Sequence, residues 1–235
     1  MTEMLYMPNV EANYIREWEA NVMAKGEDWV ELDKTAFYPE GGGQPSDTGW
    51  IDWAMGRVRV KSVTKKGGVR HFVEGLVPEG KVHCVLDWDR RFGHMRMHTA
   101  QHIVSGVVFD RFGARTVGNQ LYHDKARVDF HPIKFSQEQL AAIEQEANEI
   151  ISRNLEVQIT QELRSELEKR VNEERCNLDL IPKSVSNLRV IEVAGFDVCP
   201  CAGTHVRNTN ELGKVHILDC ESKGKDRCRL TYELI

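Results

Sequence analysis

Two histidines, His98 and His102, lie four residues apart in the run FGHMRMHTAQHIVSGVVFDRF, residues 92–112. The apolar residues of this run recur at helical spacing, so we expect a helix. Side chains four residues apart on a helix lie on the same face, one turn above the other, and two imidazoles placed in this way can bind a single metal ion. An isolated H-x-x-x-H pattern is short, and two helical histidines also occur without a metal.

A second pair of metal-binding residue types follows about a hundred residues later, in the sequence CAGTH. Its thiolate and imidazole complete a set of four ligands, the number that a tetrahedral zinc site requires. Imidazole and thiolate together suit zinc better than they suit magnesium or calcium. The sequence therefore predicts one Zn²⁺ per chain, bound by His98, His102, Cys201 and His205.

Two neighbouring residues compete for places in this ligand set. His94 lies one further helical turn before His98, and Cys199 lies two residues before Cys201. Four protein ligands make a closed, structural metal site, whereas catalysis needs an exchangeable position for water or substrate. The ligand residues in the sequence are compatible with either a structural or a catalytic metal. Thr99 occupies the position where HExxH peptidases carry a glutamate as general base, so a peptidase of that type is not expected.

The composition is typical of a soluble globular protein, with 29% charged and 41% apolar residues. We expect a cytoplasmic protein without a membrane partner, since the chain has no long apolar run and begins without a basic-then-apolar signal pattern. The six cysteines are irregularly spaced, which favours free thiols over a disulfide framework. The net charge of −5 gives no general basic field, so binding of a nucleic acid would depend on local basic clusters.

The elements that position the ligands change character near residue 90. Before it, short strand-like stretches separated by turn residues predict a small, antiparallel, β-barrel-like domain over residues 1–90. The predicted strands are residues 29–33, 49–54, 57–66, 67–75 and 81–88. Between the first two, Gly41, Gly42 and Gly43 lie in a loop whose backbone we expect to adopt unusual angles or to lie close to another group.

Residues 91–235 mix helices and strands without a regular βαβ alternation, which predicts a two-layer α+β domain that holds the zinc. The chain as a whole is therefore assigned to the α+β class. Ser136 is expected to cap a helix that extends to Asn154, with Gln139 in the capping-box position. The other expected elements are the metal-binding helix, a strand pair at 114–131, a strand at 155–160, a charged helix at 162–175, a strand at 188–193 and two C-terminal strands.

Three motifs, taken in order, resemble one protein family. The stretches FYPEGGGQPSDTG, HTAQH and CAGTHV are similar to motifs of the alanyl-tRNA editing proteins called AlaX and of the editing region of alanyl-tRNA synthetases. The similarity spans roughly residues 30–220, and three motifs in order are more specific than any one of them. The class II aminoacylation core is not apparent, so the chain resembles the free-standing editor with the glycine-rich N-terminal module that the smallest members lack.

The resemblance implies a trans-editing hydrolase that deacylates mischarged tRNA(Ala), chiefly seryl-tRNA(Ala), with glycyl-tRNA(Ala) as a second candidate. It implies that zinc forms the catalytic centre, either by activating water or by anchoring the amino group of the substrate. It also implies that Thr35 discriminates between amino-acid side chains, since a hydroxyl of the substrate is selected by hydrogen bonding. The residues implied to border the editing pocket or the acceptor end are Gly41, Gly42, Gly43 and Gln44.

Two other functions remain open at this point. One is a non-catalytic RNA-binding module in which zinc only holds the second domain together, and the other is a metal hydrolase that acts on a small ester or amide. In the editing hydrolase and in the RNA-binding module alike, local basic side chains would contact the phosphates of the RNA. The candidate clusters are Lys61, Lys65, Lys66 and Arg70; Arg90, Arg91 and Arg96; and Lys223, Lys225, Arg227 and Arg229.

Overall fold

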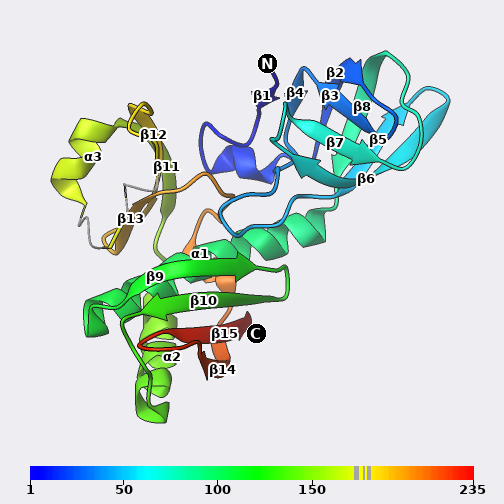
Figure 1. The fold of residues 1–235 in the computed structure, drawn as a ribbon. Helices are drawn as coiled ribbons and strands as arrows, with labels where there is room; N and C mark the ends of the chain where they lie inside the picture. The colour runs from blue at the N-terminus through cyan, green and yellow to red at the C-terminus, as the bar shows by residue number, and fades with distance from the viewer. Residues whose placement is uncertain (172–174, 177, 179–180) are drawn as a thin grey trace.

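The computed structural model describes residues 1–171, 175–176, 178 and 181–235. A long helix, α1 (Trp88–Phe112), runs through the middle of the molecule (Figure 1). In this view the strands of the N-terminal part lie above one end of α1, and a four-stranded sheet lies below it. A separate three-stranded sheet, which carries the short helix α3 (Arg164–Arg170), lies above the opposite end of α1 in the same view. The α+β class is confirmed.

Six antiparallel strands of the N-terminal part close into a barrel in the order β2-β3-β7-β6-β5-β8, with β8 paired to β2. Every second side chain of β2 from Trp18 to Val22 is buried, which is the alternation expected of a strand with one face in a core. The predicted β-barrel is thus confirmed. The strands are β2 (Glu17–Lys25), β3 (Trp29–Leu32), β5 (Gly49–Trp53), β6 (Gly56–Thr64), β7 (Arg70–Val73) and β8 (Gly80–Leu86). Beside it, β1 (Glu3–Met4) pairs with β4 (Lys34–Thr35), and the 3₁₀ helix η1 (Glu11–Tyr14) precedes β2.

The glycine-rich loop forms a tight two-residue turn. The amide of Gly41 donates to the carbonyl of Gln44, and the amide of Gln44 donates back to the carbonyl of Gly41. Gly42 and Gly43 lie between them with φ angles of 58° and 80°, the pattern of a type I′ turn. A Cβ on Gly43 would lie 1.7 Å from the Oδ1 atom of Asn119. Both predictions for this loop, unusual backbone angles and a close approach to another group, are confirmed.

The helix predicted at residues 92–112 is confirmed and begins four residues earlier, at Trp88. It ends at Gly113, which adopts the left-handed conformation (φ 65°) that commonly terminates helices. Several of its apolar side chains, among them Met95, Ile103 and Val107, are fully buried in the core formed with the four-stranded sheet. Although α1 is 25 residues long, none of the helices in the described ranges is long and apolar enough to cross a membrane.

The four-stranded antiparallel sheet has the order β14-β15-β10-β9 and packs against α1 and α2 (Gln137–Ser152). Its strands are β9 (Arg115–Leu121), β10 (Lys125–His131), β14 (Val215–Ser222) and β15 (Cys228–Leu234). Ser136 caps α2, and its hydroxyl accepts from the amide of Gln139 while the Gln139 side chain accepts from the amide of Ser136. The predicted strand pair, the two C-terminal strands and the capping box are confirmed.

The three-stranded sheet pairs β11 (Val157–Leu163) with β12 (Asn187–Val193), and β12 with β13 (Asp197–Pro200). β11 and β12 correspond to the predicted strands at 155–160 and 188–193, whereas β13 was not predicted. Helix α3 covers only the first part of the predicted 162–175 helix, of which residues 172–174 lie outside the described residues. A 3₁₀ helix, η3 (Thr209–Leu212), precedes β14.

The prediction of free thiols is wrong for two cysteines. Cys220 on β14 and Cys228 on β15 form a disulfide, with their Cα atoms 6.5 Å apart. The two strands form an antiparallel hairpin, and the pairing of Ser222 with Cys228 places the two thiols near each other across it. Sequence spacing alone did not indicate this pairing. The free cysteines are Cys84, Cys176, Cys199 and Cys201.

Candidate metal centre

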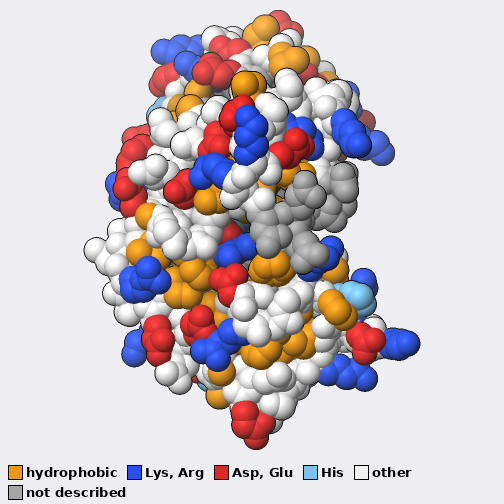
Figure 2. All heavy atoms as spheres, turned by 90° about the vertical axis from the view of Figure 1, so that its left-hand side faces the viewer, with side chains coloured by type: hydrophobic (Ala, Val, Ile, Leu, Met, Phe, Trp, Pro, Cys, Tyr) orange, Lys and Arg blue, Asp and Glu red, His pale blue; other side chains and the backbone are white. Residues whose placement is uncertain are grey.

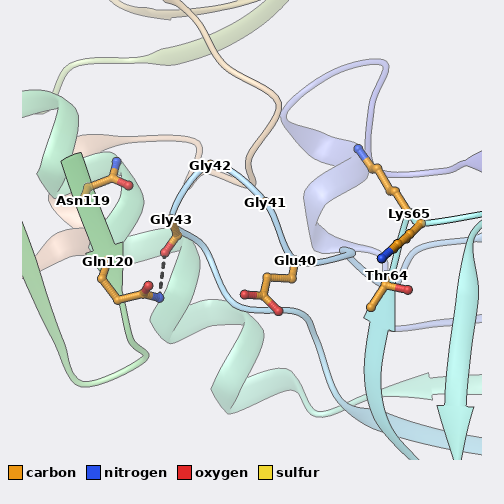
Figure 3. A pocket seen from close by; sticks show the side chains of 9 residues that line it. Glu40, Gly41, Gly42, Gly43, Thr64, Lys65, Asn119 and Gln120 are labelled. Atoms are coloured by element: carbon orange, nitrogen blue, oxygen red, sulfur yellow. Dashed lines mark hydrogen bonds between the residues drawn. The ribbon is translucent and has the colours of Figure 1, made fainter. Parts of the chain in front are cut away.

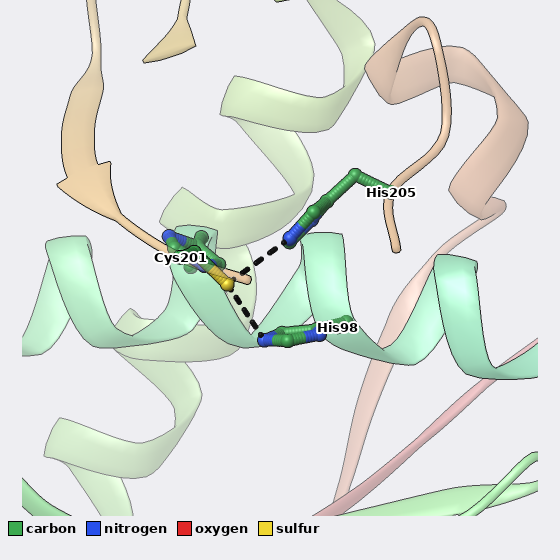
Figure 4. Close-up of side chains that lie close together, drawn as sticks. His98, Cys201 and His205 are labelled. Atoms are coloured by element: carbon green, nitrogen blue, oxygen red, sulfur yellow. Dashed lines mark hydrogen bonds between the residues drawn. The ribbon is translucent and has the colours of Figure 1, made fainter. Parts of the chain in front are cut away.

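Four side chains from two distant parts of the chain meet beside α1, and we call them the four-ligand cluster. Their possible ligand atoms all lie within 4.8 Å of one another. The Sγ atom of Cys201 lies 3.4 Å from the Nε2 atoms of both His98 and His205 (Figure 4). Helix α1 supplies two ligands one turn apart, and the loop after β13 supplies the others. The members of the four-ligand cluster are His98, His102, Cys201 and His205.

Each histidine of the cluster uses its Nδ1 atom for a hydrogen bond outside the cluster. His98 Nδ1 lies 2.9 Å from the Gln44 side-chain oxygen, and His102 Nδ1 lies 2.8 Å from a carboxylate oxygen of Asp197. His205 Nδ1 lies 3.1 Å from the hydroxyl of Thr99. Such contacts fix the tautomer and the orientation of metal-ligating histidines and leave Nε2 available to the metal. The cluster therefore fits a divalent metal ion, and its one sulfur and three nitrogen atoms match the ligands that zinc prefers.

The charges inside the cluster favour metal binding by the thiol. Burial of the Cys201 thiol opposes its ionisation, but His98 and His205 outweigh this effect and hold the pKa of the thiol well below its usual value. Burial, assisted by His98, lowers the pKa of His205 to about 3, so this ring is neutral at pH 7. Thiolate and neutral imidazole are the forms that bind metals.

His102 has the opposite tendency. Its burial favours the neutral ring, but hydrogen bonds with Asp197 and Cys201 outweigh burial and raise the pKa of His102 to about 10. A metal that binds the Nε2 atom of His102 has to displace the proton held there, so metal binding is accompanied by proton release.

Gln44 connects the glycine-rich turn to the cluster. Its side chain is fully buried, and its oxygen accepts from the amide of Thr204 (3.1 Å) besides contacting His98. Its side-chain nitrogen donates to the hydroxyl of Thr204 (2.9 Å). Gly203 completes this contact, because a Cβ there would lie 2.1 Å from the ring of His98. The structure thus places Gln44 directly behind His98, a candidate metal ligand.

Replacing Gln44 by methionine is expected to weaken metal binding about 10- to 100-fold, because His98 then loses the partner that orients its ring. Competition with a chromophoric chelator measures the affinity directly. Gln101→Met is the matched control, since Gln101 is also nearly buried beside the cluster but its amide donates to Ser105 instead of contacting a ligand. Equal affinities for the wild type and Gln44→Met would contradict the orienting role.

Thr35, the predicted side-chain discriminator, lies on β4 beside the barrel and is fully buried. Burial lowers the pKa of His71 to about 4, so its ring is neutral. The Nδ1 atom of His71 lies 3.1 Å from the carbonyl of Val30, which can only accept a hydrogen bond, and Nε2 is therefore the unprotonated atom. Consequently the hydroxyl of Thr35 donates to Nε2 of His71 (2.9 Å) and accepts from the amide of Phe37 (3.1 Å).

Gly41, Gly42 and Gly43 border an open pocket of about 600 Å³ between the barrel and β9 (Figure 3). The carbonyl of Gly43 accepts from the amide of Leu121 (2.8 Å) and from the side chain of Gln120 (3.1 Å), which holds the turn against β9. None of the cluster residues lines this pocket, but Gln44, the residue after Gly43, contacts His98 and so connects the turn to the candidate metal centre. We call the cavity the glycine-turn pocket. Its lining comprises Glu40, Gly41, Gly42, Gly43, Thr64, Lys65, Lys66, Asn119 and Gln120.

The two competing ligand candidates lie outside the cluster. His94 is fully buried and faces His123, with the ring centroids 6.4 Å apart. The thiol of Cys199 interacts with that of Cys176, which raises the pKa of Cys199 well above its usual value. Cys201, two residues later, is the cysteine whose sulfur reaches the histidines.

Sequence reasoning missed three residues that hold the cluster. Asp197 and Asn13 are distant in the sequence from the ligands that they contact, and neither belongs to a recognised motif; the Asn13 side chain accepts from the amide of His205 (2.7 Å). Thr99 lies inside the HTAQH motif, where its position next to a ligand was the only available signal. Its hydroxyl contacts His205 and also donates to the carbonyl of Met95 (3.0 Å).

One member of the predicted basic clusters is not available to a nucleic acid. Arg91 is fully buried and forms an ion pair with Asp47, itself only 1% exposed. Its guanidinium also donates to the carbonyls of Asn13 and Ala36. The expectation that Arg91 contributes to a phosphate-binding surface is therefore wrong, because a charge count along the sequence does not show which arginine is buried.

Two family models match the parts of the chain on either side of α1. Residues 7–90, which include the barrel and the glycine-rich turn, match the model described as tRNA synthetases class II (A). Residues 188–231 match the second additional domain of threonyl and alanyl tRNA synthetases. The latter segment contains Cys201 and His205.

Full-length relatives decide the family. The alanyl-tRNA editing protein AlaX-M of Methanosarcina mazei is 37% identical over 248 residues, covering 100% of this chain and 97% of the relative. The chain belongs to the AlaX family of alanyl-tRNA editing proteins. AlaX-M of Saccharolobus solfataricus is 36% identical over 99% of this AlaX chain and 98% of its own length. The alanine–tRNA ligase of Thermococcus kodakarensis is 40% identical over 88% of this chain, but the match covers only 23% of the ligase.

Proposed function

We propose that this AlaX chain hydrolyses, in trans, the ester that joins a wrong amino acid to the 3′ adenosine of tRNA(Ala). Seryl-tRNA(Ala) is the chief substrate and glycyl-tRNA(Ala) the second candidate. The observation that carries the proposal is a largely buried cluster with zinc-type ligands, connected through Gln44 to the glycine-rich turn, in a chain whose relatives along their full length are named alanyl-tRNA editing proteins. We place this activity in the cytoplasm, where aminoacyl-tRNAs are used.

Hydrolysis of an ester needs a positioned water, polarisation of the carbonyl and stabilisation of the developing oxyanion. Zinc bound by the four-ligand cluster would supply Lewis acidity, a bound water of lowered pKa or an anchor for the amino group of the substrate. In this proposal His98, His102, Cys201 and His205 are the metal ligands and form the catalytic centre. Thr99, Gln44 and Asp197 orient the three imidazoles.

The test is deacylation of purified seryl-tRNA(Ala), with seryl-tRNA(Ser) as the control for tRNA identity and glycyl-tRNA(Ala) as the second substrate. We expect rapid loss of serine from tRNA(Ala) and background loss from tRNA(Ser). A folded, zinc-loaded protein that binds tRNA(Ala) without releasing serine would contradict the proposal. That outcome would favour the non-catalytic RNA-binding module with a structural zinc.

Thr35 is proposed to set the preference among amino-acid side chains. Because the hydroxyl proton of Thr35 is held by His71, we propose that Thr35 acts through the shape of the loop and turn that follow it. In this proposal Gly41, Gly42 and Gly43 border the amino acid or the terminal adenosine.

Thr35→Val is expected to change the ratio of serine to glycine release and to lower the free energy of unfolding by about 1–3 kcal/mol, because Nε2 of His71 loses its donor. Thr35→Ser keeps the hydroxyl and is the matched control for both measurements. Deacylation of the two substrates gives the ratio, and urea unfolding gives the stability. An unchanged ratio in Thr35→Val would remove Thr35 from substrate selection, whatever its effect on stability.

A further inference from the structure

Among the predicted basic residues Lys61, Lys65, Lys66 and Arg70, some form an ion pair with a described residue and others do not. Lys61 forms an ion pair with Glu74 (2.9 Å), and Arg70 contacts Glu31 (3.4 Å). Lys65 and Lys66 follow the end of β6, line the glycine-turn pocket and have no carboxylate partner within the described ranges. Two cations that line one pocket and form no ion pair are typical of a site for an anion.

The other two basic clusters are less suitable for a ligand near the metal centre. Arg90 and Arg96 donate to backbone carbonyls, and Lys223 and Arg229 are paired with Glu221 and Asp129. The turn at residues 223–227 lies at the end of the sheet where Cys228 of β15 pairs with Phe130 of β10. The pocket contacts β9 at Asn119 and Gln120, which pair with β10 further from that end.

The positive charge of the pocket continues towards the metal centre. Partial burial and the positive charge of Arg189 both lower the pKa of Lys65. Arg189 is 6% exposed, and its guanidinium donates to the carbonyl of Cys201 (2.6 Å). In the described part of the chain Arg189 forms no ion pair with an aspartate or glutamate, so its charge adds to that of the lysines.

The pocket also offers neutral donors. The backbone amides of Gly42 and Gly43 have no hydrogen-bond acceptor among the described residues, and the side chain of Asn119 is likewise unpaired there. Successive free amides in a glycine turn are a common way to bind phosphate oxygens. Glu40 is the one carboxylate in the lining, and Figure 3 shows its side chain pointing away from Lys65.

We propose that the glycine-turn pocket binds a backbone phosphate of the RNA acceptor end, with Lys65 and Lys66 as its cationic contacts and the amides of Gly42 and Gly43 as its neutral donors. This inference rests on the proposed function and assigns one of the three basic clusters to the substrate. Because Gln44 follows the turn directly and contacts His98, a phosphate held here brings the 3′ end of the RNA to the four-ligand cluster. The pocket volume of about 600 Å³ lies within the ordinary range of small-ligand sites.

The experiment measures the affinity of the protein for a tRNA(Ala) acceptor-stem hairpin without an attached amino acid, over a range of salt concentrations. For the double variant Lys65→Met/Lys66→Met, we expect weaker binding and a shallower dependence of log K on log salt, by about 1 per lysine. Lys61→Met is the matched control, because Lys61 lies on β6, the strand that leads into Lys65 and Lys66, and is already paired with Glu74; it should keep the wild-type slope. Glu40→Gln should bind more tightly, since it removes the negative charge from the pocket.

A second hairpin lacks the single-stranded 3′ end. Wild type and double variant should bind this RNA equally, because the phosphate that the lysines contact is missing. A wild-type slope in the double variant, an equal loss in Lys61→Met, or an undiminished effect of the lysines on the truncated hairpin would each overturn the phosphate site. Deacylation by the wild type is measured separately. If the wild type deacylates seryl-tRNA(Ala) but the double variant keeps the wild-type salt slope, only the phosphate site is refuted. If the double variant has a shallower slope but the wild type does not deacylate, only the proposed function is refuted.

Discussion

Cys201→Ser is expected to abolish deacylation of seryl-tRNA(Ala) and to weaken zinc binding by at least about 100-fold. Removing a residue that orients a metal ligand lowers metal affinity about 10- to 100-fold. Because Cys201 is itself a proposed ligand, we expect its removal to cost at least the upper end of this range. Its sulfur lies 3.4 Å from two histidine nitrogens and is the only sulfur in the four-ligand cluster. Zinc content of the purified protein and competition with a chelator measure binding, and the rate of serine release measures activity.

Cys199→Ser is the matched control, because Cys199 lies two residues earlier and interacts with Cys176 instead of the cluster. It should keep its zinc and its activity. If Cys201→Ser stays folded, loses zinc and still releases serine at the wild-type rate, the metal has no part in catalysis. If Cys201→Ser unfolds and the intact wild type shows no turnover, the zinc is structural and the RNA-binding module is the better description.

Arg91→Met is expected to lower the free energy of unfolding by about 3–5 kcal/mol, the usual cost of removing one partner of a buried ion pair. The carboxylate of Asp47 would remain almost fully buried without its counter-charge, and the carbonyls of Asn13 and Ala36 would lose a donor. Since Arg91 lies on α1 and its partners lie in the N-terminal part of the chain, the same change loosens the junction between the two. Urea unfolding followed by circular dichroism measures the effect.

Arg57→Met tests the assumption about burial. Arg57 also pairs with an aspartate, Asp52, but its side chain is 53% exposed, and exposed ion pairs contribute little to stability. A double change of Arg91 and Asp47 to apolar residues should recover part of the loss, because no charge is then left buried. If the free energy of unfolding of Arg91→Met lies within about 1 kcal/mol of that of the wild type, the Arg91–Asp47 pair does not stabilise the junction between α1 and the N-terminal part of the chain.

Local patterns in the sequence were sufficient for many elements of the fold. The alternation of apolar residues predicted the barrel strands, because a half-buried strand repeats every two residues. Ser136 and Gln139 predicted the start of α2, since a capping box depends on residues only three positions apart. Likewise, the spacing of His98 and His102 predicted two imidazoles on one helical face. These predictions hold because each depends on contacts between residues that are close together in the chain.

Only the tertiary structure decided which residues support the site. Gln44 and Asp197 contact their histidines across 54 and 95 positions of the chain, so no local period reveals them. The same holds for the burial of Arg91, for the bond between Thr35 and His71 and for the disulfide of the C-terminal hairpin. The sequence by itself determined the candidate ligand types, the helix that carries two of them and the family resemblance. Folding determined which side chains orient the ligands and which cations remain exposed, because both depend on the packing of distant segments.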